Sequence, residues 1–321
     1  MKQTALEKAC RIAIVDCMGT KKKEKILIVT DENKRKIGYA LYDTAVQLGY
    51  ESLIVEMKSG KINGEEPPAY VAQLMKGFDV VLCPTTKSLT HTNARREASA
   101  LGTRVATFPG ITEEIMVRGL NADYKKIAAL TNKLAGILDK TKIVKVTAPS
   151  GTDITMDITG RGGHSSKGLF HKKGESGNLP TGEAYIAPLE GKTNGVFIVD
   201  GSMAGIGVIG TKPIRIEVKN GLAVSFNGGK EAKMLEKMLM PYGAKGRNIA
   251  EFGIGTNDKA RLSGLILEDE KVMGTIHIAL GDNKSMGGNV NVPVHLDGIV
   301  KKPMVFFDGK VIMKDGKLLV K

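Results

Sequence analysis

Two histidines and an aspartate near the carboxyl end of the chain are the residues best suited to chemistry. His277 lies in the apolar run GTIHIAL, and His295 opens the triplet His-Leu-Asp, which ends at Asp297. In an extended segment, residues i and i+2 point to the same side, so His295 and Asp297 share a face. Two imidazoles and a carboxylate form a metal site suited to zinc, cobalt, manganese or iron. The stretch from Met273 to Gly298 therefore predicts a metal centre.

Two glutamates fit the same chemistry. Glu183, in NLPTGEAYIAP, and Glu251, in RNIAEFGIGTN, each stand at the start of an otherwise apolar run. A carboxylate entering an apolar strand costs free energy unless it is paired or bound to a metal. The competing interpretation of His277 is a hydrogen-bonded histidine of the core. The His-x-Asp pair favours the metal interpretation.

The elements that must position these residues fall into two groups. Up to residue 143, the strand-like runs KILIVTD, SLIVEM, VVLCP and RVATFPG alternate with helical patterns, the last from Thr112 to about Asp139. Such alternation predicts an α/β domain with a doubly wound parallel sheet over residues 1–143. Residues 144–321 show short alternating strands, with Asn220-Gly221, Asp308-Gly309 and Asp315-Gly316 as hairpin turns. We therefore predict a β-rich α+β metal-binding domain there.

Composition narrows the class of protein. The N-terminal segment reads as an amphipathic helix rather than a signal peptide, and no apolar run is long enough to span a bilayer. Cys10, Cys17 and Cys83 fit neither a disulfide framework nor a thiolate zinc site, which predicts a cytoplasmic protein. The net charge of +13 comes from scattered lysines, and tryptophan is absent. We expect no nucleic-acid partner and no membrane partner.

Three further motifs have competing interpretations. The sequence from Gly205 to Gly210 matches GxGxxG, but a strand pattern follows it, so we expect no dinucleotide cofactor. His164 and His171 lie in a Gly/Ser/Lys-rich loop and are expected on the surface. His91, in SLTHTNARREA, is either a polar residue at a helix start or a residue facing a cleft at the carboxyl end of the parallel sheet.

Four segments resemble the thermophilic metallo-aminopeptidases of the aminopeptidase S/T type, which are leucyl aminopeptidase-like. They are SLTHTNARREASALGTRVATFPGIT, GNLPTGEAYIAPLEG, AEFGIGTN, and HIALGDN with the later HLDG. The resemblance implies a homodimer with an enclosed two-metal site that hydrolyses N-terminal residues of small peptides. It implies two zinc, cobalt or manganese ions, with Glu251 as the bridging, catalytic ligand. The implied metal ligands are Glu183, Glu251, His277, His295 and Asp297.

The same resemblance places His91 near the substrate. His91 is not spaced with the other candidate ligands, so we expect it to contact substrate or transfer a proton rather than bind metal. Its ordinary pKa lies close to neutral, which suits such a catalytic role.

Two positions depart from the aminopeptidase pattern. That family usually has a glutamate five residues before the HIALG histidine, where this chain has Val272 and the nearest acid is Glu270. It also has a tyrosine just after HIALG, where Gly281 is followed here by Asp282-Asn283. These differences weaken the prediction of peptidase activity and leave the predicted fold unchanged.

A second family is similar to the same segments. The 2,5-dihydroxypyridine ring-cleaving dioxygenases have the related fold, and the likeness implies one Fe(II) held by His277, His295 and Asp297. Retention of Glu183 and Glu251 favours the two-metal hydrolase, because one iron ion does not require both. A binding protein that has kept the fold and lost the metal is the third alternative, against which the five intact candidate ligands argue.

Overall fold

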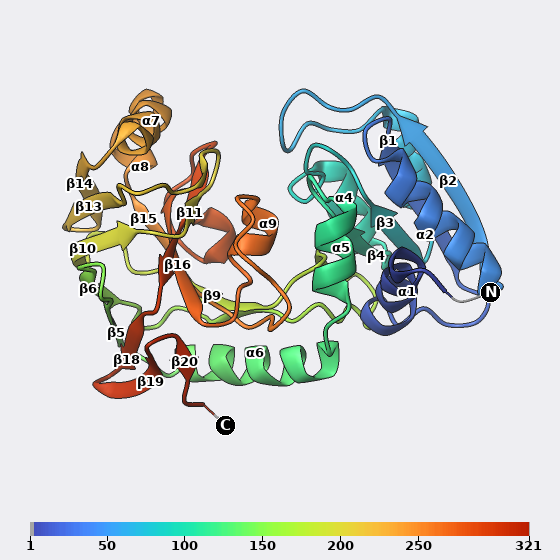
Figure 1. Ribbon diagram of the computed structural model, residues 1–321. Helices are drawn as coiled ribbons and strands as arrows, with labels where there is room; N and C mark the ends of the chain where they lie inside the picture. The colour runs from blue at the N-terminus through green and yellow to red at the C-terminus, as the bar shows by residue number, and fades with distance from the viewer. Residues whose placement is uncertain (1–2, 321) are drawn as a thin grey trace. The chain divides into compact units, whose positions relative to one another are not determined.

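The structure is a computed structural model that describes residues 3–320, and it contains two compact units (Figure 1). The first extends to Lys125 and includes Gly168–Thr181, while the second comprises Lys126–Lys167 and the chain from Gly182 onward. These limits do not coincide with the boundary drawn from the sequence between residues 143 and 144. The predicted boundary divides the chain into two domains, which are not the same thing as these compact units, so it stays a prediction.

Five parallel strands form the sheet of the first unit. Their order is β2-β1-β3-β4-β8, and every neighbouring pair is parallel. The doubly wound α/β sheet expected from the sequence is thereby confirmed. Strand β8 was not predicted, because its residues Ser-Gly-Asn form no apolar run. The strands are β1 (Lys25–Asp31), β2 (Glu51–Met57), β3 (Val80–Cys83), β4 (Arg104–Thr107) and β8 (Ser176–Asn178).

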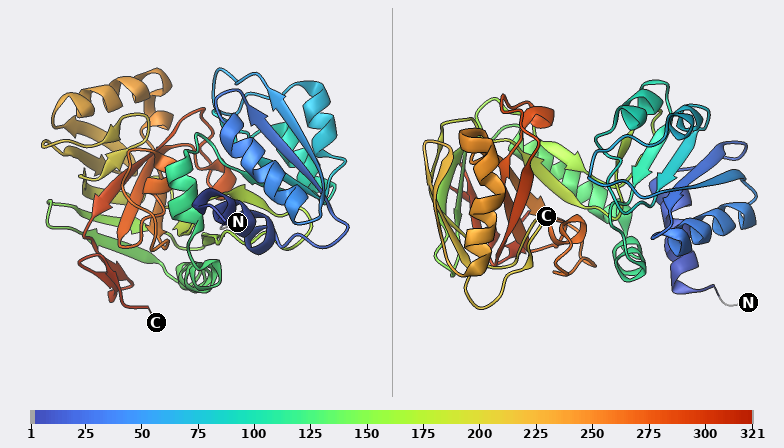
Figure 2. Two further views of the ribbon diagram at one scale, coloured as in Figure 1. Left: turned by 45° about the vertical axis from the view of Figure 1, so that its right-hand side comes forward. Right: turned by 90° about the horizontal axis from the view of Figure 1, so that it is seen from above.

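Helices cover both faces of this sheet (Figure 2). Leu27 of β1 and Val81 of β3 pack in one apolar cluster with Met75 of α3 and Ala94 of α4. Helix α2 packs against β1 and β2. Successive strand residues alternate between the two faces, so both faces of each inner strand are buried. The helices are α1 (Ala5–Arg11), continued by a π-helix (Ile12–Cys17), α2 (Arg35–Gln47), α3 (Ala69–Met75), α4 (Asn93–Ala100) and α5 (Glu113–Leu120).

The single helix predicted from Thr112 to about Asp139 is wrong, because the structure has two helices there. Helix α5 ends at Leu120, and α6 (Tyr124–Leu138) begins after a short break. In the break, the Asn121 side chain donates to the carbonyl of Val117, and the Asp123 carboxylate accepts from the backbone N–H of Lys125. Asn and Asp side chains compete in this way with the helical backbone, which the apolar periodicity alone does not reveal.

The second unit contains two antiparallel sheets. One has the order β14-β13-β10-β6-β5-β18-β19-β20 and the other has the order β12-β11-β17-β16-β15-β9-β7. The strands of the first are β5 (Ile143–Thr147), β6 (Asp153–Asp157), β10 (Thr193–Val199), β13 (Ile214–Lys219), β14 (Leu222–Asn227), β18 (Met304–Phe307), β19 (Lys310–Lys314) and β20 (Lys317–Leu318). Those of the second are β7 (His164–Ser166), β9 (Glu183–Ile186), β11 (Ser202–Met203), β12 (Gly207–Val208), β15 (Ile249–Gly255), β16 (Thr275–Gly281) and β17 (His295–Lys301).

The predicted hairpin turns are confirmed by the backbone. Asn220, Asp308 and Asp315 have φ angles of 49°, 46° and 49°, and each is followed by a glycine with positive φ. A tight hairpin needs two successive residues of positive φ, a conformation that Asn-Gly and Asp-Gly adopt readily. These turns therefore set the register of β13 with β14, of β18 with β19 and of β19 with β20.

One apolar core joins both sheets and two helices of the second unit. It includes Ile154 and Val218 from the eight-stranded sheet, Ile278 from the seven-stranded sheet, Leu134 of α6 and Leu235 of α7. The remaining helical segments are α7 (Lys230–Leu239), α8 (Gly243–Gly246), α9 (Ile266–Asp269) and the 3-10 turns Met240–Tyr242 and Lys284–Met286. Among residues 3–320, no helix combines the length and apolar character needed to cross a bilayer. The core occupies one face of the seven-stranded sheet and leaves the other for polar residues.

Gly136 of α6 offers a direct test of this packing. A Cβ placed there meets nothing within 4 Å, whereas at Gly163 it would lie 2.5 Å from the carbonyl oxygen of Ala135. We expect Gly136→Ala to raise the free energy of unfolding by about 0.5–1 kcal/mol, because alanine loses less backbone entropy in a helix. Gly163→Ala should lower it. Urea denaturation of the two variants checks both signs, and a destabilised Gly136→Ala protein would contradict this packing of α6.

Candidate metal centre

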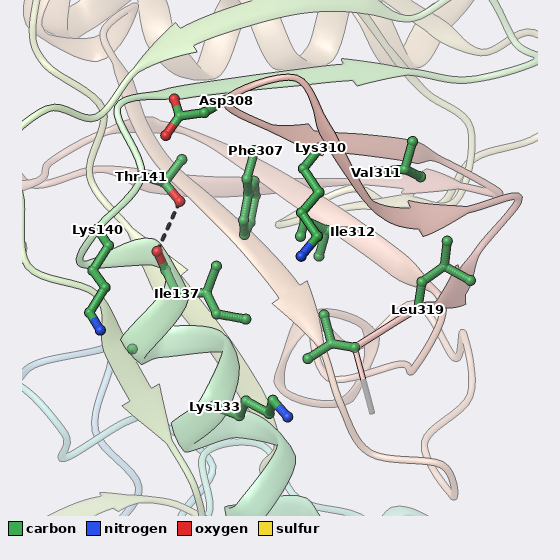
Figure 3. Close-up of a pocket in the computed structure, with 12 residues that line it drawn as sticks. Lys133, Ile137, Lys140, Thr141, Phe307, Asp308, Lys310, Val311, Ile312 and Leu319 are labelled. Carbon is green, nitrogen blue, oxygen red and sulfur yellow. Dashed lines mark hydrogen bonds between the residues drawn. The ribbon is translucent and has the colours of Figure 1, made fainter.

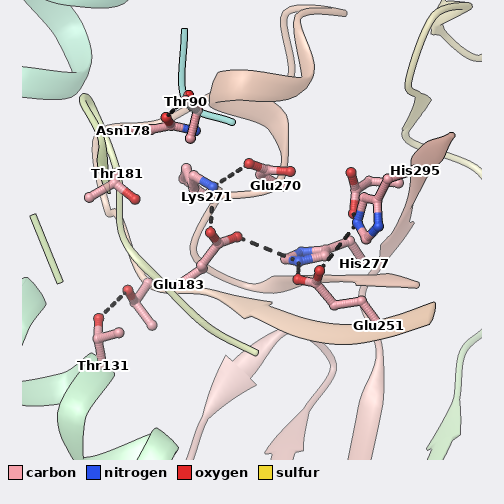
Figure 4. Close-up of polar contacts among 12 residues, drawn as sticks. Thr90, Thr131, Asn178, Thr181, Glu183, Glu251, Glu270, Lys271, His277 and His295 are labelled. Atoms are coloured by element: carbon pink, nitrogen blue, oxygen red, sulfur yellow. Dashed lines mark hydrogen bonds and ion pairs between the residues drawn. The ribbon is translucent and has the colours of Figure 1, made fainter. Parts of the chain in front are cut away.

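Four neighbouring strands of the seven-stranded sheet present all five candidate ligands on one face. On β16, Ile276, Ile278 and Leu280 enter the apolar core, so the alternate residue His277 points to the opposite face. The same alternation applies to β9 and β17, and a bulge modifies it in β15. The candidate ligands are Glu183 on β9, Glu251 on β15, His277 on β16, and His295 and Asp297 on β17. Figure 4 shows the first four of them. The sheet therefore brings together the five residues that the sequence singled out.

A β-bulge in β15 gives Glu251 its direction. Ile249 pairs with Leu280, and Glu251 pairs with Ala279, so two steps along β15 correspond to one step along β16. Ile249 and Phe252 both lie in the apolar core, which strict alternation would not allow for residues three apart. The extra residue, Ala250, shifts the alternation and turns Glu251 to the polar face. Bulges of this kind commonly redirect side chains next to active sites.

The carboxylate of Glu251 lies between the two imidazoles. Its Oε1 is 3.1 Å from Nε2 of His277, and its Oε2 is 3.2 Å from Nε2 of His295. His277 Nε2 also lies 3.5 Å from Glu183 Oε2, and His295 Nε2 lies 3.5 Å from Asp297 Oδ1. These atoms form two groups of three potential ligands that share Glu251. Each group has one histidine and two carboxylates.

Gly253 provides the space that His277 occupies. It pairs with His277 across β15 and β16, and a Cβ at this position would lie only 2.0 Å from His277 Nε2. The imidazole therefore lies directly over the main chain of β15. Only glycine leaves room for the ring in this position, which is why a strand interior contains a residue that otherwise weakens strands.

The loop between β16 and β17 orients His295. Nδ1 of His295 donates to the carbonyl of Asp282 at 2.7 Å, which leaves Nε2 directed at the carboxylates. Glu190 anchors this loop by accepting from Asn283 Nδ2 at 2.9 Å and from the backbone N–H of Asn289 at 2.7 Å. A hydrogen bond on the second ring nitrogen fixes the tautomer and orientation of a metal-binding histidine.

A buried lysine adjoins the ligand cluster. Lys271 Nζ lies 2.6 Å from Glu183 Oε1 and also contacts the carboxylate of Glu270 (Figure 4). Only 3% of its side chain is exposed. Sequence analysis did not identify Lys271, because it follows the charged run LEDE, and such runs usually form solvated surface.

Electrostatic coupling shifts the pKa values of these groups strongly. Burial opposes the charge on His277, but the hydrogen bond and the charge of Glu251 raise its pKa to about 9. Burial likewise opposes the charge on His295, and Asp297 and Glu251 raise its pKa well above the ordinary range. Burial would raise the pKa of Glu251, but the two imidazoles lower it overall. Without a cation, protons on both histidines thus neutralise the carboxylates.

His91 lies in the first unit, in the turn between β3 and α4, and its side chain is exposed. The cap of α4 is Thr92, whose hydroxyl accepts from the backbone N–H of Arg95 at 3.2 Å. His91 therefore agrees with the turn part of the interpretation as a capping or turn residue, whereas the cap itself is Thr92. Its expected role in substrate contact or proton transfer stays a prediction.

Polar side chains gather at the carboxyl ends of the parallel strands of the first unit. Thr107 ends β4 and Asn178 ends β8, and the Thr107 hydroxyl donates to Asn178 Oδ1 at 2.7 Å. Thr90 contacts both, with Oγ1 2.8 Å from Thr107 Oγ1 and 2.9 Å from Asn178 Oδ1 (Figure 4). This edge is where open α/β sheets present their ligand crevice.

The second unit also contains a pocket of about 550 Å³ that is lined by other residues than the candidate ligands (Figure 3). Residues of α6, β18 and β19 line it, among them Lys133, Ile137, Phe307 and Lys310. Its lining contains none of the five candidate ligands. The histidines and carboxylates, and not this pocket, therefore define the candidate metal centre.

The close approach of His277 to Gly253 predicts the effect of one added methyl group. In Gly253→Ala, the imidazole must leave its position, and we expect loss of divalent-metal binding with retained secondary structure. Elemental analysis and circular dichroism measure the two properties. Gly136→Ala, whose added Cβ has no neighbour within 4 Å, is the matched control. Full metal occupancy in Gly253→Ala would show that His277 is not needed as a ligand.

The raised histidine pKa values predict that metal binding depends on pH. Because His277 titrates near 9 in the metal-free protein, a metal ion at neutral pH must displace its proton and that of His295. Apparent affinity for Zn²⁺ or Co²⁺ should therefore rise from pH 6 to pH 9, with release of about two protons per ion at pH 7. Calorimetry in buffers of different ionisation enthalpy measures this number. Binding without proton release would contradict the assignment.

Comparisons with known proteins agree with this arrangement of elements. A curated 2,5-dihydroxypyridine 5,6-dioxygenase of Pseudomonas putida is 21% identical over 251 residues, which cover 73% of this chain and 69% of the relative. The solved structure of 2,5-dihydroxypyridine dioxygenase from the same organism superposes with a TM-score of 0.84 at 16% identity, covering 100% and 99% of the two chains. AmpT from Thermus thermophilus gives a TM-score of 0.72 at 17% identity, covering 98% and 99%.

These findings correct the predicted activity. The prediction of a metallo-aminopeptidase, a protease that hydrolyses small peptides, was wrong, and the likeness to AmpT concerns the fold alone. The aminopeptidase prediction used all five ligands and the dioxygenase alternative used only His277, His295 and Asp297, so retention of Glu183 and Glu251 was given too much weight in favour of the hydrolase. The sequence model of the 2,5-dihydroxypyridine 5,6-dioxygenase family, NicX, matches residues 6–320. The chain therefore belongs to the 2,5-dihydroxypyridine 5,6-dioxygenase family.

Proposed function

We propose that this protein is a mononuclear Fe(II) dioxygenase that cleaves the ring of 2,5-dihydroxypyridine. The observation that carries the proposal is the set His277, His295 and Asp297, which β16 and β17 present on one face of the sheet. Two histidines and one carboxylate are the ligands typical of non-haem iron oxygenases. Family membership supplies the reaction class and the substrate.

The buried donor atoms fit a metal ion. Two oxygen atoms of the ligand cluster, Asp297 Oδ1 and Glu183 Oε2, are among the buried atoms of the described residues that lack a hydrogen-bond partner. Buried polar atoms in native proteins are almost always satisfied, and a site that binds an ion is one of the standard reasons for exceptions. The nitrogen and oxygen donors suit iron better than a soft, thiolate-binding metal.

His277, His295 and Asp297 would hold Fe(II), and the ion would supply the activation of oxygen for ring cleavage. The protein contributes the orientation of its ligands, through the hydrogen bond of His295 Nδ1 to Asp282 and through the space at Gly253. Glu251 lies within 3.2 Å of Nε2 of both imidazoles. Its lowered pKa keeps it ionised, so it adds negative charge beside the cation.

An aromatic surface adjoins the ligands on β9. Tyr185 is on the same face as Glu183, since the two are separated by one residue on the strand. Its ring stacks on His164, with centroids 5.0 Å apart and planes 19° from parallel. His164, expected at the surface, is thus part of a ring pair in the structure. We propose that this pair offers a planar pyridine ring a surface for stacking.

Anaerobic reconstitution with Fe(II) tests the proposed function. We expect one iron per chain and consumption of one O₂ per 2,5-dihydroxypyridine, because a dioxygenase incorporates both oxygen atoms into its product. His295→Ala and Asp297→Asn should lower turnover by more than the roughly 100-fold typical of substitutions outside the ligand set.

His171→Ala is the matched control for the histidine substitution. His171 contacts the carbonyl of Asp16 through Nε2 at 2.8 Å, and both residues belong to the first unit. This variant should keep iron and turnover. No oxygen uptake by wild-type protein that holds one iron per chain would refute the proposed function.

A further inference from the structure

The ligand cluster contains donors for two ions rather than one. One group consists of Glu183, Glu251 and His277, and the other consists of Glu251, His295 and Asp297. A carboxylate shared by two such groups is an arrangement that can bridge a pair of metal ions. The number of ligands therefore does not explain why the centre would bind only the one ion of the proposed function.

Lys271 places a positive charge in the first of these groups. Its Nζ lies 2.6 Å from Glu183 Oε1 and also contacts Glu270. The side chains of Lys271, Glu183 and Glu270 are 3%, 9% and 15% exposed. A buried ammonium group is stable only when carboxylates pair with it, and these two carboxylates do so. Glu183 is thus already neutralised by a cation from the chain itself.

The main chain around Lys271 is fixed on both sides. Its backbone N–H donates to the carbonyl of Glu268 at 2.9 Å, and its carbonyl accepts from the N–H of Asn257 at 2.9 Å. Asp269, at the end of α9, accepts from the N–H groups of Ser263 and Gly264. Lys271 therefore cannot withdraw its ammonium group by a simple movement of its backbone.

We infer that the ammonium group of Lys271 takes the place of a second metal ion and limits the centre to one ion per chain. A second ion bound by Glu183, Glu251 and His277 would take His277 from the first ion, which would keep Glu251, His295 and Asp297. That second ion would lie beside a fixed positive charge and would compete with it for Glu183. Repulsion between like charges is strong in a buried site. Within residues 3–320, the ion-pair partners of Glu251 and Asp297 are histidines, and no lysine or arginine pairs with either carboxylate.

This inference rests on the proposed mononuclear function, but it concerns metal count and not the substrate. Its test is titration of metal-free protein with Co²⁺ or Zn²⁺, followed by equilibrium dialysis and elemental analysis. We expect one ion in wild-type protein and in Lys271→Arg, which keeps the charge. Lys271→Met, which removes the charge and keeps a side chain of similar length, should bind two ions. Its affinity for the second ion should exceed any residual affinity of wild-type protein for a second ion by at least about 100-fold.

The double variant Lys271→Met/Glu183→Gln is the matched control, because it removes both the ammonium group and the carboxylate that the second ion would use. It should return to one ion. Lys271→Met removes the ammonium partner of Glu183 and Glu270 and is expected to be less stable without metal. In that case, two equivalents of Co²⁺ should restore its melting temperature, and one equivalent should not.

Three results separate the possible failures. Two ions in wild-type protein would overturn the inference, and so would a single ion in Lys271→Met that has regained its fold. In the second case the mononuclear dioxygenase proposal stands. One ion in wild-type protein and two in Lys271→Met, without ring cleavage by the iron-loaded wild type, would support the inference and refute the proposed function.

Discussion

The two faces of the seven-stranded sheet have opposite chemistry, and the candidate metal centre depends on that difference. Apolar residues such as Phe252 and Ile278 fill the core on one face, and this fixes the register of β9, β15, β16 and β17. The ligands converge because they occupy the alternate positions. A slip of one residue would bury His277 in the core and expose its apolar neighbours. The register of these strands therefore determines both the packing of the core and the placement of the ligands.

Charge neutralisation is the second requirement of the centre. Glu183, Glu251 and Asp297 are all buried, and buried carboxylates need cations, protons or hydrogen bonds. In the metal-free protein, the protons of His277 and His295 and the ammonium group of Lys271 supply this positive charge. An incoming metal ion can displace protons readily, whereas it cannot displace a covalently attached lysine. The three cations are therefore not equivalent, although each contacts at least one carboxylate of the ligand cluster.

Much of the fold and all five candidate ligands could be predicted from the sequence, because strand alternation and turn residues are local signals. The Asn220-Gly221 turn and the His-x-Asp pair of β17 are examples. Strand β8 could not be predicted, since its pairing with β4 depends on a partner about 70 residues away. Lys271 was missed because burial of a charged run depends on tertiary structure. The activity was mistaken because the same donor types suit both a two-metal hydrolase and a mononuclear iron oxygenase.

The chain passes between the two compact units more than once, and this affects the order in which they form during synthesis. The segment Gly168–Thr181 belongs to the first unit, although the residues before and after it belong to the second. When the ribosome has produced β4, that strand still has a free edge, and its partner β8 emerges only after β5, β6 and β7. The first unit therefore cannot be completed before part of the second has been made. Cutting the chain at any single point between Lys126 and Thr181 separates residues that belong to the same unit.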